Sequence, residues 1–266
     1  MLRRRMAAVA CFLLLGIGAV DDLHAQAPPL VFTSPAPSSE SASQDVRVNP
    51  IVAERGLMLW SGGGDFGVGV DLAAPRWTIR SVESMNVLAV NGRARPTFQQ
   101  LEIISPVLVR PSARIAAGGG VREEWDGTRV LIARGVAGAD IASGRLQGSV
   151  VFEHALSSPA RRDAADMIVT AGWVRRINPH IAIGLEGIAQ DLEGFWDAAE
   201  ADGGARVLAG PSLQLRSPNG AWSASATFGP VIGSASSAPS ARAVGDSAGR
   251  HFGVFASATW APSSRR

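Results

Sequence analysis

The stretch Met167-IVTAGWVRRINPHIAIGLEGIAQ-Asp191 contains two runs of alternating residues that meet at Asn178-Pro179. Met167, Val169, Ala171 and Trp173 alternate with Ile168, Thr170, Gly172 and Val174, and the second run from Ile181 alternates in the same way. A period of two is the pattern of a β-strand whose two faces meet different surroundings. Each run is long enough to cross a bilayer as a tilted strand, which takes roughly 9–11 residues. The stretch therefore predicts a β-hairpin of membrane-spanning length.

The first 27 residues have the three parts of a secretory signal peptide. A basic head at Arg3 to Arg5 precedes an apolar run at 6–20, and Ala25-Gln26-Ala27 offers a small-x-small cleavage site. The apolar run is shorter than the roughly 20 residues that a spanning helix needs. Cys11 is the only cysteine and lies in this run, so the mature chain is predicted to have neither a disulfide nor a reactive thiol.

Two regions follow the signal peptide. Residues 28–51 are rich in proline and serine, which cannot build a core, and we predict a disordered linker there. Residues 52–266 are predicted to form one β-barrel domain. The net charge is only +2, and no basic cluster with interleaved aromatics occurs, so nucleic acid is not an expected partner. No apolar run of 18 residues follows the signal, which excludes helical spans.

The alternation of the opening stretch recurs along the chain. Asn91-Gly92 and Asp126-Gly127 are tight-turn dipeptides that separate some of the runs. The pattern predicts an all-β, antiparallel up-and-down transmembrane β-barrel of about 10–12 strands. A soluble barrel or a β-sandwich would produce a similar series of strands. The expected strands, of which the first is the weakest, are 55–61, 66–72, 76–90, 98–109, 113–125, 128–137, 145–156, 167–177, 181–190, 206–216, 221–232 and 251–260.

Two features favour the membrane. Connections near the C-terminus alternate between short (178–179, 217–220) and long (192–205, 233–250), as in barrels with short periplasmic turns and longer external loops. Tryptophans also fall where this topology predicts the periplasmic interface of the membrane. The indole ring suits that interface because its body is apolar and its one N–H can stay hydrated. These interface residues are Trp77, Trp173, Trp222 and Trp260.

The signal peptide, the alternating strands and the near-terminal aromatic resemble the bacterial outer-membrane β-barrels as a broad class, over about residues 55–260. The resemblance implies a place in the outer membrane, with its lipids and the barrel-assembly machinery as partners. The segments Gly184-Leu185-Glu186 and Gly210-Pro211 look like parts of a family motif, to which no known activity attaches. Residues 261–266 after Trp260 differ from the usual barrel ending, as does the absence of tyrosine.

If lipid covers the apolar parity, the other parity faces a lumen. Opposite charges there can pair and fill the lumen, or line a water path for small solutes or ions, and the sequence leaves both open. It identifies no particular solute. Arg134 falls on the lipid-facing parity and is an unexplained misfit. The expected lumen-lining residues are Glu102, Arg114, Arg122, Glu124, Arg145, Glu153, Glu186 and Arg206.

Motifs for enzymatic or metal chemistry are weak. The five carboxylates of residues 191–204 lack the spacing of a calcium loop, so we expect a solvated acidic loop and predict no metal and no cofactor. Gly118-Gly119-Gly120 lacks the lysine of a phosphate loop. A Ser–His pair could be drawn at His154 with Glu153, but alternate parity puts these two on opposite faces.

The sequence predicts no catalytic residues, and three hypotheses follow. The first is an outer-membrane barrel that is either structural or a narrow passive pore, and not an enzyme. The second is a soluble periplasmic β-sandwich or barrel that binds a ligand or partner through its loops. The third is a lipid-modifying barrel enzyme that uses His154 or His251.

Overall fold

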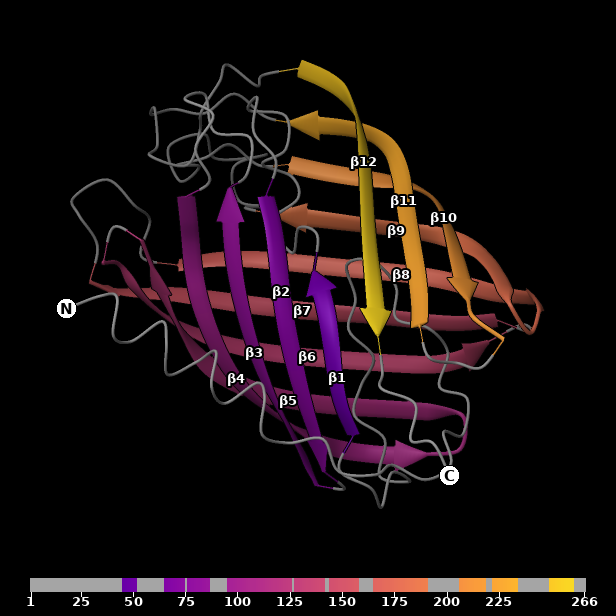
Figure 1. Cartoon of the computed structure of the whole chain (residues 1–266), viewed down its shortest axis with the longest axis horizontal. Helices are drawn as coiled ribbons and strands as arrows, with labels where there is room; N and C mark the ends of the chain where they lie inside the picture. Colours follow the sequence, from indigo (N-terminus) through magenta and orange to yellow (C-terminus); the bar gives the residue numbers. More distant parts are fainter. Residues whose placement is uncertain are drawn as a thin grey trace.

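The computed structural model describes residues 45–51, 65–74, 76–86, 95–125, 127–141, 144–157, 165–190, 206–218, 222–233 and 249–260. The elements of this part of the chain are β-strands (Figure 1), and it contains no helix of the length and apolarity needed to cross a membrane. The strands are β1 (Asp45–Ile51), β2 (Asp65–Ala74), β3 (Trp77–Asn86), β4 (Arg95–Arg110), β5 (Ala113–Glu124), β6 (Arg129–Ile141), β7 (Gly144–Ser157), β8 (Ala165–Asn178), β9 (Ile181–Gln190), β10 (Arg206–Arg216), β11 (Trp222–Gly233) and β12 (Gly249–Trp260).

Each strand pairs antiparallel with the next one along the chain, and β1 pairs with β12 at Val48 and Trp260 to close the barrel. The predicted all-β up-and-down barrel is confirmed, with twelve strands in the described part of the chain. The predicted end of the linker at residue 51 is wrong, because Asp45–Ile51 is β1 and pairs with β2. The expected signal peptide, the rest of the linker and the expected strand at 55–61 lie outside the described residues.

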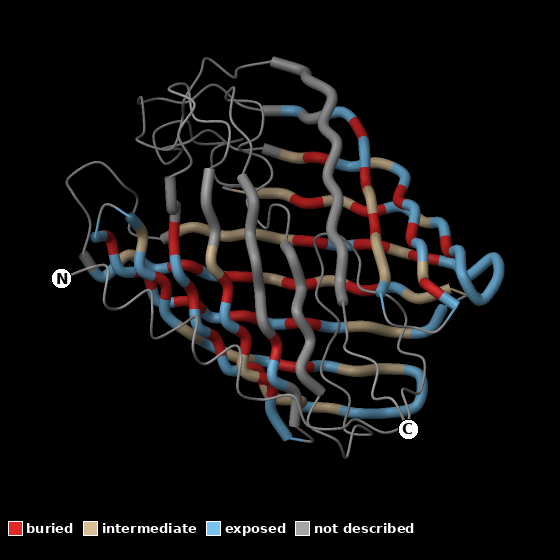
Figure 2. Tube along the Cα trace, in the orientation of Figure 1, coloured by how far each residue is buried: buried red, intermediate tan, exposed pale blue. Residues whose placement is uncertain are grey.

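Where the burial of side chains is described, as along β4 to β7 and β9 to β11, buried residues alternate with more exposed ones, and Figure 2 shows this as red segments between pale blue or tan ones. On β6, for example, every second residue from Val130 to Val136 is buried, while Leu131 between them is exposed. Large apolar side chains cover the outer face. A continuous surface of this kind is unfavourable in water and suited to hydrocarbon. Members of this outer belt include Leu101, Ile103, Val121, Leu131, Leu146, Phe152, Ile183, Leu185, Leu213 and Phe228.

The hairpin predicted at Asn178-Pro179 is confirmed, since it joins β8 to β9. The side-chain Oδ1 of Asn178 accepts hydrogen bonds from the backbone N–H groups of His180 and Ile181, at 2.8 and 2.9 Å. Asparagine favours turns because its side chain can satisfy the donors that the turn frees. Pro179 has no N–H that would need a partner.

The two rims of the barrel differ. Five connections are short in sequence (75–76, 111–112, 142–143, 179–180 and 217–221), and the strand ends that flank them lie at one end of the barrel, along the lower and right edges of Figure 1. We call this end the short-turn rim. At the opposite rim the connection between β5 and β6 is also tight: Gly127 adopts a φ of 89°, which favours glycine, and donates to the carbonyl of Glu124 at 2.9 Å.

Candidate functional site: the barrel lumen

Buried charged residues occupy the inward face of the first half of the barrel and are held in pairs. On β2 and β3, Asp71 and Arg80 are direct register partners. The guanidinium of Arg80 donates from Nε and Nη2 to the two carboxylate oxygens of Asp71, both at 2.9 Å. A bidentate contact of this kind fixes both side chains, because the planar fork of arginine matches the carboxylate.

Glu102 and Arg134 form a second bidentate pair, with both distances at 2.9 Å, and Gln100 also donates to Glu102 at 2.7 Å. Arg134 is buried and faces inward, so the expectation that it faces lipid is wrong. The pair joins β4 to β6 and passes over β5, where Gly118 and Gly120 stand opposite the two side chains. A Cβ at Gly120 would meet the Cγ of Glu102 at 2.8 Å, so the glycine makes room for this carboxylate.

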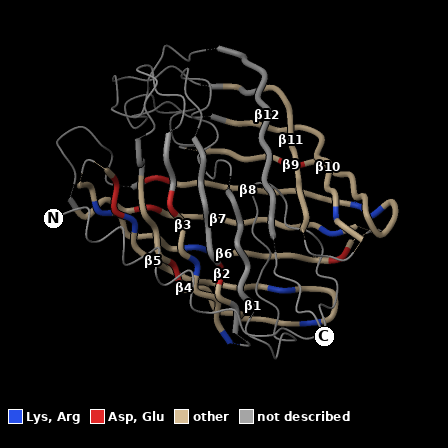
Figure 3. The backbone as a smooth tube through the Cα atoms, in the orientation of Figure 1, with Lys and Arg blue, Asp and Glu red and all other residues tan. Residues whose placement is uncertain are grey.

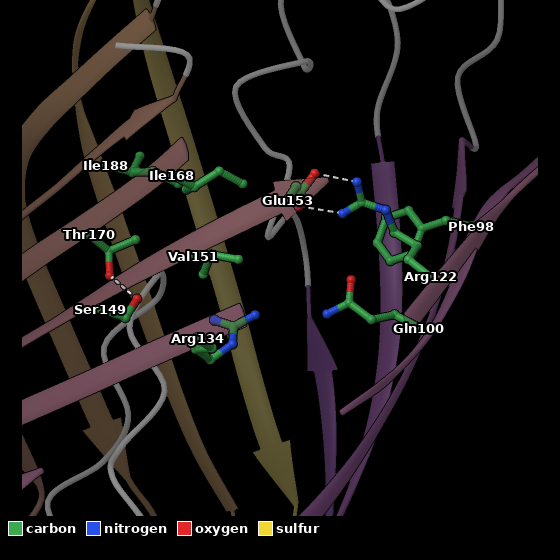
Figure 4. A pocket seen from close by; sticks show the side chains of 10 residues that line it. All are labelled: Phe98, Gln100, Arg122, Arg134, Ser149, Val151, Glu153, Ile168, Thr170 and Ile188. Atoms are coloured by element: carbon green, nitrogen blue, oxygen red, sulfur yellow. Dashed lines mark hydrogen bonds and ion pairs between the residues drawn. The ribbon is translucent and has the colours of Figure 1, made fainter. Parts of the chain in front are cut away.

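Arg122 is the centre of a third group (Figure 4). Its Nη1 and Nη2 donate to the two carboxylate oxygens of Glu153, and Nη2 also lies 3.2 Å from Oε1 of Glu124. The ring of Phe98 lies under the guanidinium, 5.5 Å from its centroid, in cation–π geometry. Arg122 on β5 thus holds a carboxylate on β7 across the intervening β6.

In the described part of β8 to β11, the inward face carries neutral polar groups together with the buried carboxylate of Glu186. The hydroxyl of Thr227 on β11 donates to Oε2 of Glu186 on β9 at 2.7 Å, again across one strand. On the intervening β10, Gly210 is the register partner of Glu186 and Pro211 that of Leu185. The two segments that the sequence suggested as a family motif are therefore neighbours in the wall.

These three contacts share one geometry, which we call a strand-crossing contact: two inward side chains on strands separated by one strand. The three contacts are Arg134 with Glu102, Arg122 with Glu153, and Thr227 with Glu186. In the first and the last, an inward glycine of the middle strand stands opposite a contact residue. Each of these contacts therefore links two strands that share no backbone hydrogen bonds with each other.

A small cavity lies against the inner wall beside these pairs. A cavity of about 20 Å³ lies among Gln100, Arg122, Arg134, Glu153 and Thr170, which is space for about one water molecule. Apolar side chains also point inward, including Val130, Ile132 and Val151, which pack together beside the ion pairs. The sequence did not predict these inward apolar residues, because alternation alone assigns apolar side chains to lipid.

Some buried polar atoms lack a protein partner. Gln214 on β10 is 1% exposed, yet neither its Oε1 nor its Nε2 has a hydrogen bond. Ser212, two residues earlier on the same face, has an unpartnered Oγ, and Oε1 of Gln147 on β7 is also unpartnered. Buried polar groups are almost always hydrogen-bonded, and water supplies the bond where protein does not. Water inside the lumen would supply the hydrogen bonds that these atoms lack.

The predicted lumen residues fall into three groups. Glu102, Arg122, Glu153 and Glu186 are buried on the inward face, and the contacts above bring all four into pairs. Arg114, Glu124 and Arg145 are half-buried and lie nearer the rims. Arg206 begins β10, but its side chain lies outside the described part. Asp71, Arg80 and Arg134 are inward charged residues that the sequence did not place in the lumen.

Three of the four predicted interface tryptophans can be placed with their side chains. Trp77 and Trp222 begin their strands beside the short-turn rim and are exposed. Trp173 is half-buried, and its Nε1 donates to the carbonyl of Ile141 at 3.4 Å. Trp260 ends β12 and is the register partner of Trp222, while its side chain lies outside the described part.

The enzyme hypothesis gains no support from the geometry. Glu153 is buried and bound to Arg122, whereas His154 is exposed, so the two point to opposite faces. The side chain of His251, like the acidic loop at 191–204, lies outside the described residues. Within the described part, no group of three or more His, Cys, Asp or Glu side chains could hold a metal ion.

Comparison with solved structures finds membrane proteins of similar fold. The NanC porin matches with a TM-score of 0.52 and 9% identity, over 83% of this chain and 100% of the porin. A structure from work on in-meso crystallization of membrane proteins matches with a TM-score of 0.50 and 8% identity, over 82% of this chain and 83% of that one. The outer membrane channel DcaP of Acinetobacter baumannii gives 0.32 and 8%, which is too remote to carry an argument.

These likenesses identify the class of fold. The chain has the fold of the bacterial outer-membrane β-barrels, as its strand pattern predicted. No protein-family model and no curated protein matches the chain. Identity near 9% shows a shared architecture and says nothing about a shared solute.

Proposed function

We propose that this chain is an outer-membrane barrel that acts as a narrow passive pore for water and small ions. The observation that carries the proposal is the contrast between the two faces of one wall. The outer face is apolar, whereas the inner face bears paired charges and the unpartnered amide of Gln214. Leaving a buried amide without any partner costs about 1–3 kcal/mol, so water at Gln214 is strongly favoured.

The membrane location is supported by the outer surface. The apolar belt would face hydrocarbon, and exposed Trp77 and Trp222 would mark the interface at the short-turn rim. Outer-membrane barrels place their short turns in the periplasm. We therefore orient the short-turn rim to the periplasm, in agreement with export by the predicted signal peptide.

The level of the charged pairs would contribute to the selectivity of such a pore. Arg122 with Glu153, and Arg134 with Glu102, border a cavity with room for about one water. Fixed charges in a narrow path of low dielectric act strongly on mobile ions, so this level would discriminate between anions and cations.

A second function, a filled barrel with a structural role, is favoured by the same ion pairs. Three bidentate arginine–carboxylate contacts stiffen the wall, and Arg122 also contacts Glu124. A lumen built for rigidity would need them as much as a constricted pore would. The two functions differ in one measurable property, which is ion conductance.

Planar lipid bilayers with the purified chain provide the test. A narrow pore should give small, discrete conductance steps. Arg122→Gln leaves Glu153 and Glu124 unneutralised and should shift the reversal potential toward cation preference. The double variant Glu153→Gln with Glu124→Gln leaves Arg122 and should shift it toward anions. Glu123→Gln is the matched control, because Glu123 is exposed on the other face of β5 and should change neither.

Silent bilayers with a correctly folded barrel would end the pore proposal and leave the structural one. Folding is checked by the difference in gel migration between heated and unheated samples. Equal shifts from Arg122→Gln and from the control Glu123→Gln would show that conduction does not pass the Arg122 level, and the constriction would have to be placed elsewhere.

A further inference from the structure

The outer face of the barrel carries positive charge at the short-turn rim. Near the short-turn ends of β2 to β11, most of the described outward residues are apolar, such as Trp77 and Trp222. Two of the described outward residues there are charged, and both are exposed arginines. Arg110 ends β4, and Arg175 lies on β8, two residues beyond Trp173 on the same face. In the described part, the apolar belt therefore ends in positive charge at this rim.

The register places each of these arginines among apolar neighbours. Arg175 is the ladder partner of Ile183 on β9, which is 48% exposed. Arg110 is the partner of Ala113, and Ile115, two residues along the same face of β5, is 43% exposed. In the described part of these paired strands, no carboxylate occupies an outward position beside either arginine. The surface beside each guanidinium thus suits acyl chains and lacks a negative group.

The opposite rim gives the other edge of the apolar belt. There Glu83, Glu123 and Arg129 are outward and charged, on β3, β5 and β6. On β5, Glu123 and Ala113, the partner of Arg110, are about ten residues apart, which is about 33 Å along the strand. A tilt of about 35–45° reduces this to roughly 25 Å across the membrane, the height of the apolar band in outer-membrane barrels. Arg110 therefore lies at the level of the lipid headgroups.

We propose that Arg110 and Arg175 bind the phosphate groups of anionic phospholipids, of the phosphatidylglycerol type, in the leaflet at the short-turn rim. Each guanidinium can donate two parallel N–H bonds to one phosphate group. A headgroup with net negative charge is favoured over a zwitterionic one, in which a cationic group offsets the phosphate. Figure 3 shows further arginines, coloured blue, at this end of the barrel, and they add to the attraction for anionic lipid. The inference rests on the membrane location proposed above but not on conduction.

Fluorescence quenching at single positions provides the test. The predicted mature chain has no cysteine, so Ile183→Cys can carry one bimane fluorophore beside Arg175. Leu72→Cys is the matched reporter, because Leu72 is an outward residue of β2 with 43% exposure whose ladder partners are Val46 and Ile79. The full chain is folded into phosphatidylcholine vesicles with a small fraction of lipid brominated on its acyl chains. The brominated lipid is either phosphatidylglycerol or phosphatidylcholine.

At equal content, brominated phosphatidylglycerol should quench the Ile183→Cys reporter more than brominated phosphatidylcholine does, by up to roughly fivefold, the contribution of one arginine near an anionic surface. The ratio at Leu72→Cys should be about one. Arg175→Gln should return the ratio at Ile183→Cys to about one, whereas Arg175→Lys keeps the charge and should keep part of the preference. Arg176→Gln is the control of equal charge, because Arg176 is the partner of Ala182, which is buried on the inward face.

The outcomes distinguish this inference from the membrane location on which it rests. No quenching of either reporter by either lipid would contradict the membrane location, and the inference with it. Equal quenching by the two lipids at Ile183→Cys would overturn the lipid preference alone and leave the arginines to solvent or to an acidic partner. A preference for the anionic lipid at both reporters, or one that survives Arg175→Gln, would assign it to the net charge of the rim and also overturn the proposal.

Ile115→Cys with Arg110→Gln repeats the experiment on β4 and β5. The same preference, and its loss in the variant, are expected there. An equal effect of the two lipids at Ile115→Cys would overturn the assignment of Arg110.

Discussion

At the residue scale, a buried charge overrides the apolar alternation of its strand. Val130 and Ile132 share a face with Arg134, and by alternation alone that face would contact lipid. The structure turns it inward, because Arg134 finds the carboxylate of Glu102 there. An arginine in hydrocarbon costs about 2–4 kcal/mol on a barrel, whereas Val130 and Ile132 are already buried on the inward face and gain little by moving to lipid.

Breaking this pair should be costly. Glu102 is 1% exposed, and Glu102→Gln would leave the guanidinium of Arg134 buried without its counter-charge. We expect the free energy of unfolding to fall by about 3–5 kcal/mol, measured by urea titration in lipid vesicles with tryptophan fluorescence. Adding Arg134→Met should restore most of the loss. The exposed Glu123→Gln is the control. A double variant as unstable as the single one would contradict the pairing.

At the element scale, glycines on the inward face of β5 shape the wall. Gly118-Gly119-Gly120 lacks the lysine of a phosphate loop, and the structure gives the run another role. A Cβ at Gly118 or Gly120 would lie 2.8 Å from a Cα of β4, closer than real Cβ atoms approach. Missing side chains in a strand interior mark such close backbone approach. The run lets β4 and β5 pack tightly beneath the Glu102–Arg134 pair.

Substitution of these glycines should distinguish the effect of close backbone approach from that of β-strand propensity. Gly120→Ala forces the backbone of β4 to move, and we expect a loss of about 1–3 kcal/mol in stability, as overpacking typically costs. Gly135→Ala on β6 is the matched control, because nothing lies within 4 Å of its Cβ position. Refolding into vesicles, followed by gel migration and urea titration, measures both. Comparable losses from the two would show that β-propensity, and not contact, is responsible.

The two faces of β11 provide a second test at this scale. Phe228 is 44% exposed in the outer belt, whereas the neighbouring Thr227 is fully buried and bonded to Glu186. Phe228→Arg places a charge in hydrocarbon and should destabilise the barrel by about 2–4 kcal/mol. Thr227→Arg should cost less, since the new charge meets the Glu186 carboxylate. Yield of folded protein in outer membranes measures both, and equal yields would refute the assignment of faces.

At the scale of the whole molecule, the two rims should lie on opposite sides of the membrane. Ser112 is exposed in a short turn, and Arg129 is exposed at the opposite rim. Cys11 is the only cysteine and belongs to the predicted signal peptide, so new cysteines can be labelled singly. Arg129→Cys should react with a membrane-impermeant maleimide on intact cells. Ser112→Cys should react only after the outer membrane is permeabilised. The reverse result would invert the proposed orientation.

The sequence by itself determined the class of fold. Alternation is local: successive residues of any strand point to opposite faces, so the outer belt and the inward positions of Arg122 and Glu186 follow from counting. The Asn178-Pro179 turn follows from the side chain of asparagine and the missing donor of proline. The prediction from sequence was wrong at β1. The richness in proline and serine led us to extend the predicted linker to residue 51, although residues 45–51 pair with β2.

Only the tertiary structure decided which charges meet. Arg122 and Glu153 are 31 positions apart, Arg134 and Glu102 are 32 apart, and Thr227 and Glu186 are 41 apart. Each of these contacts also skips one strand, so it depends on two successive registers. A shift of one residue in either register would turn a partner to the other face. The registers of β5, β6 and β7 are set by the whole wall and not by any one strand, so no local pattern could have given these pairs.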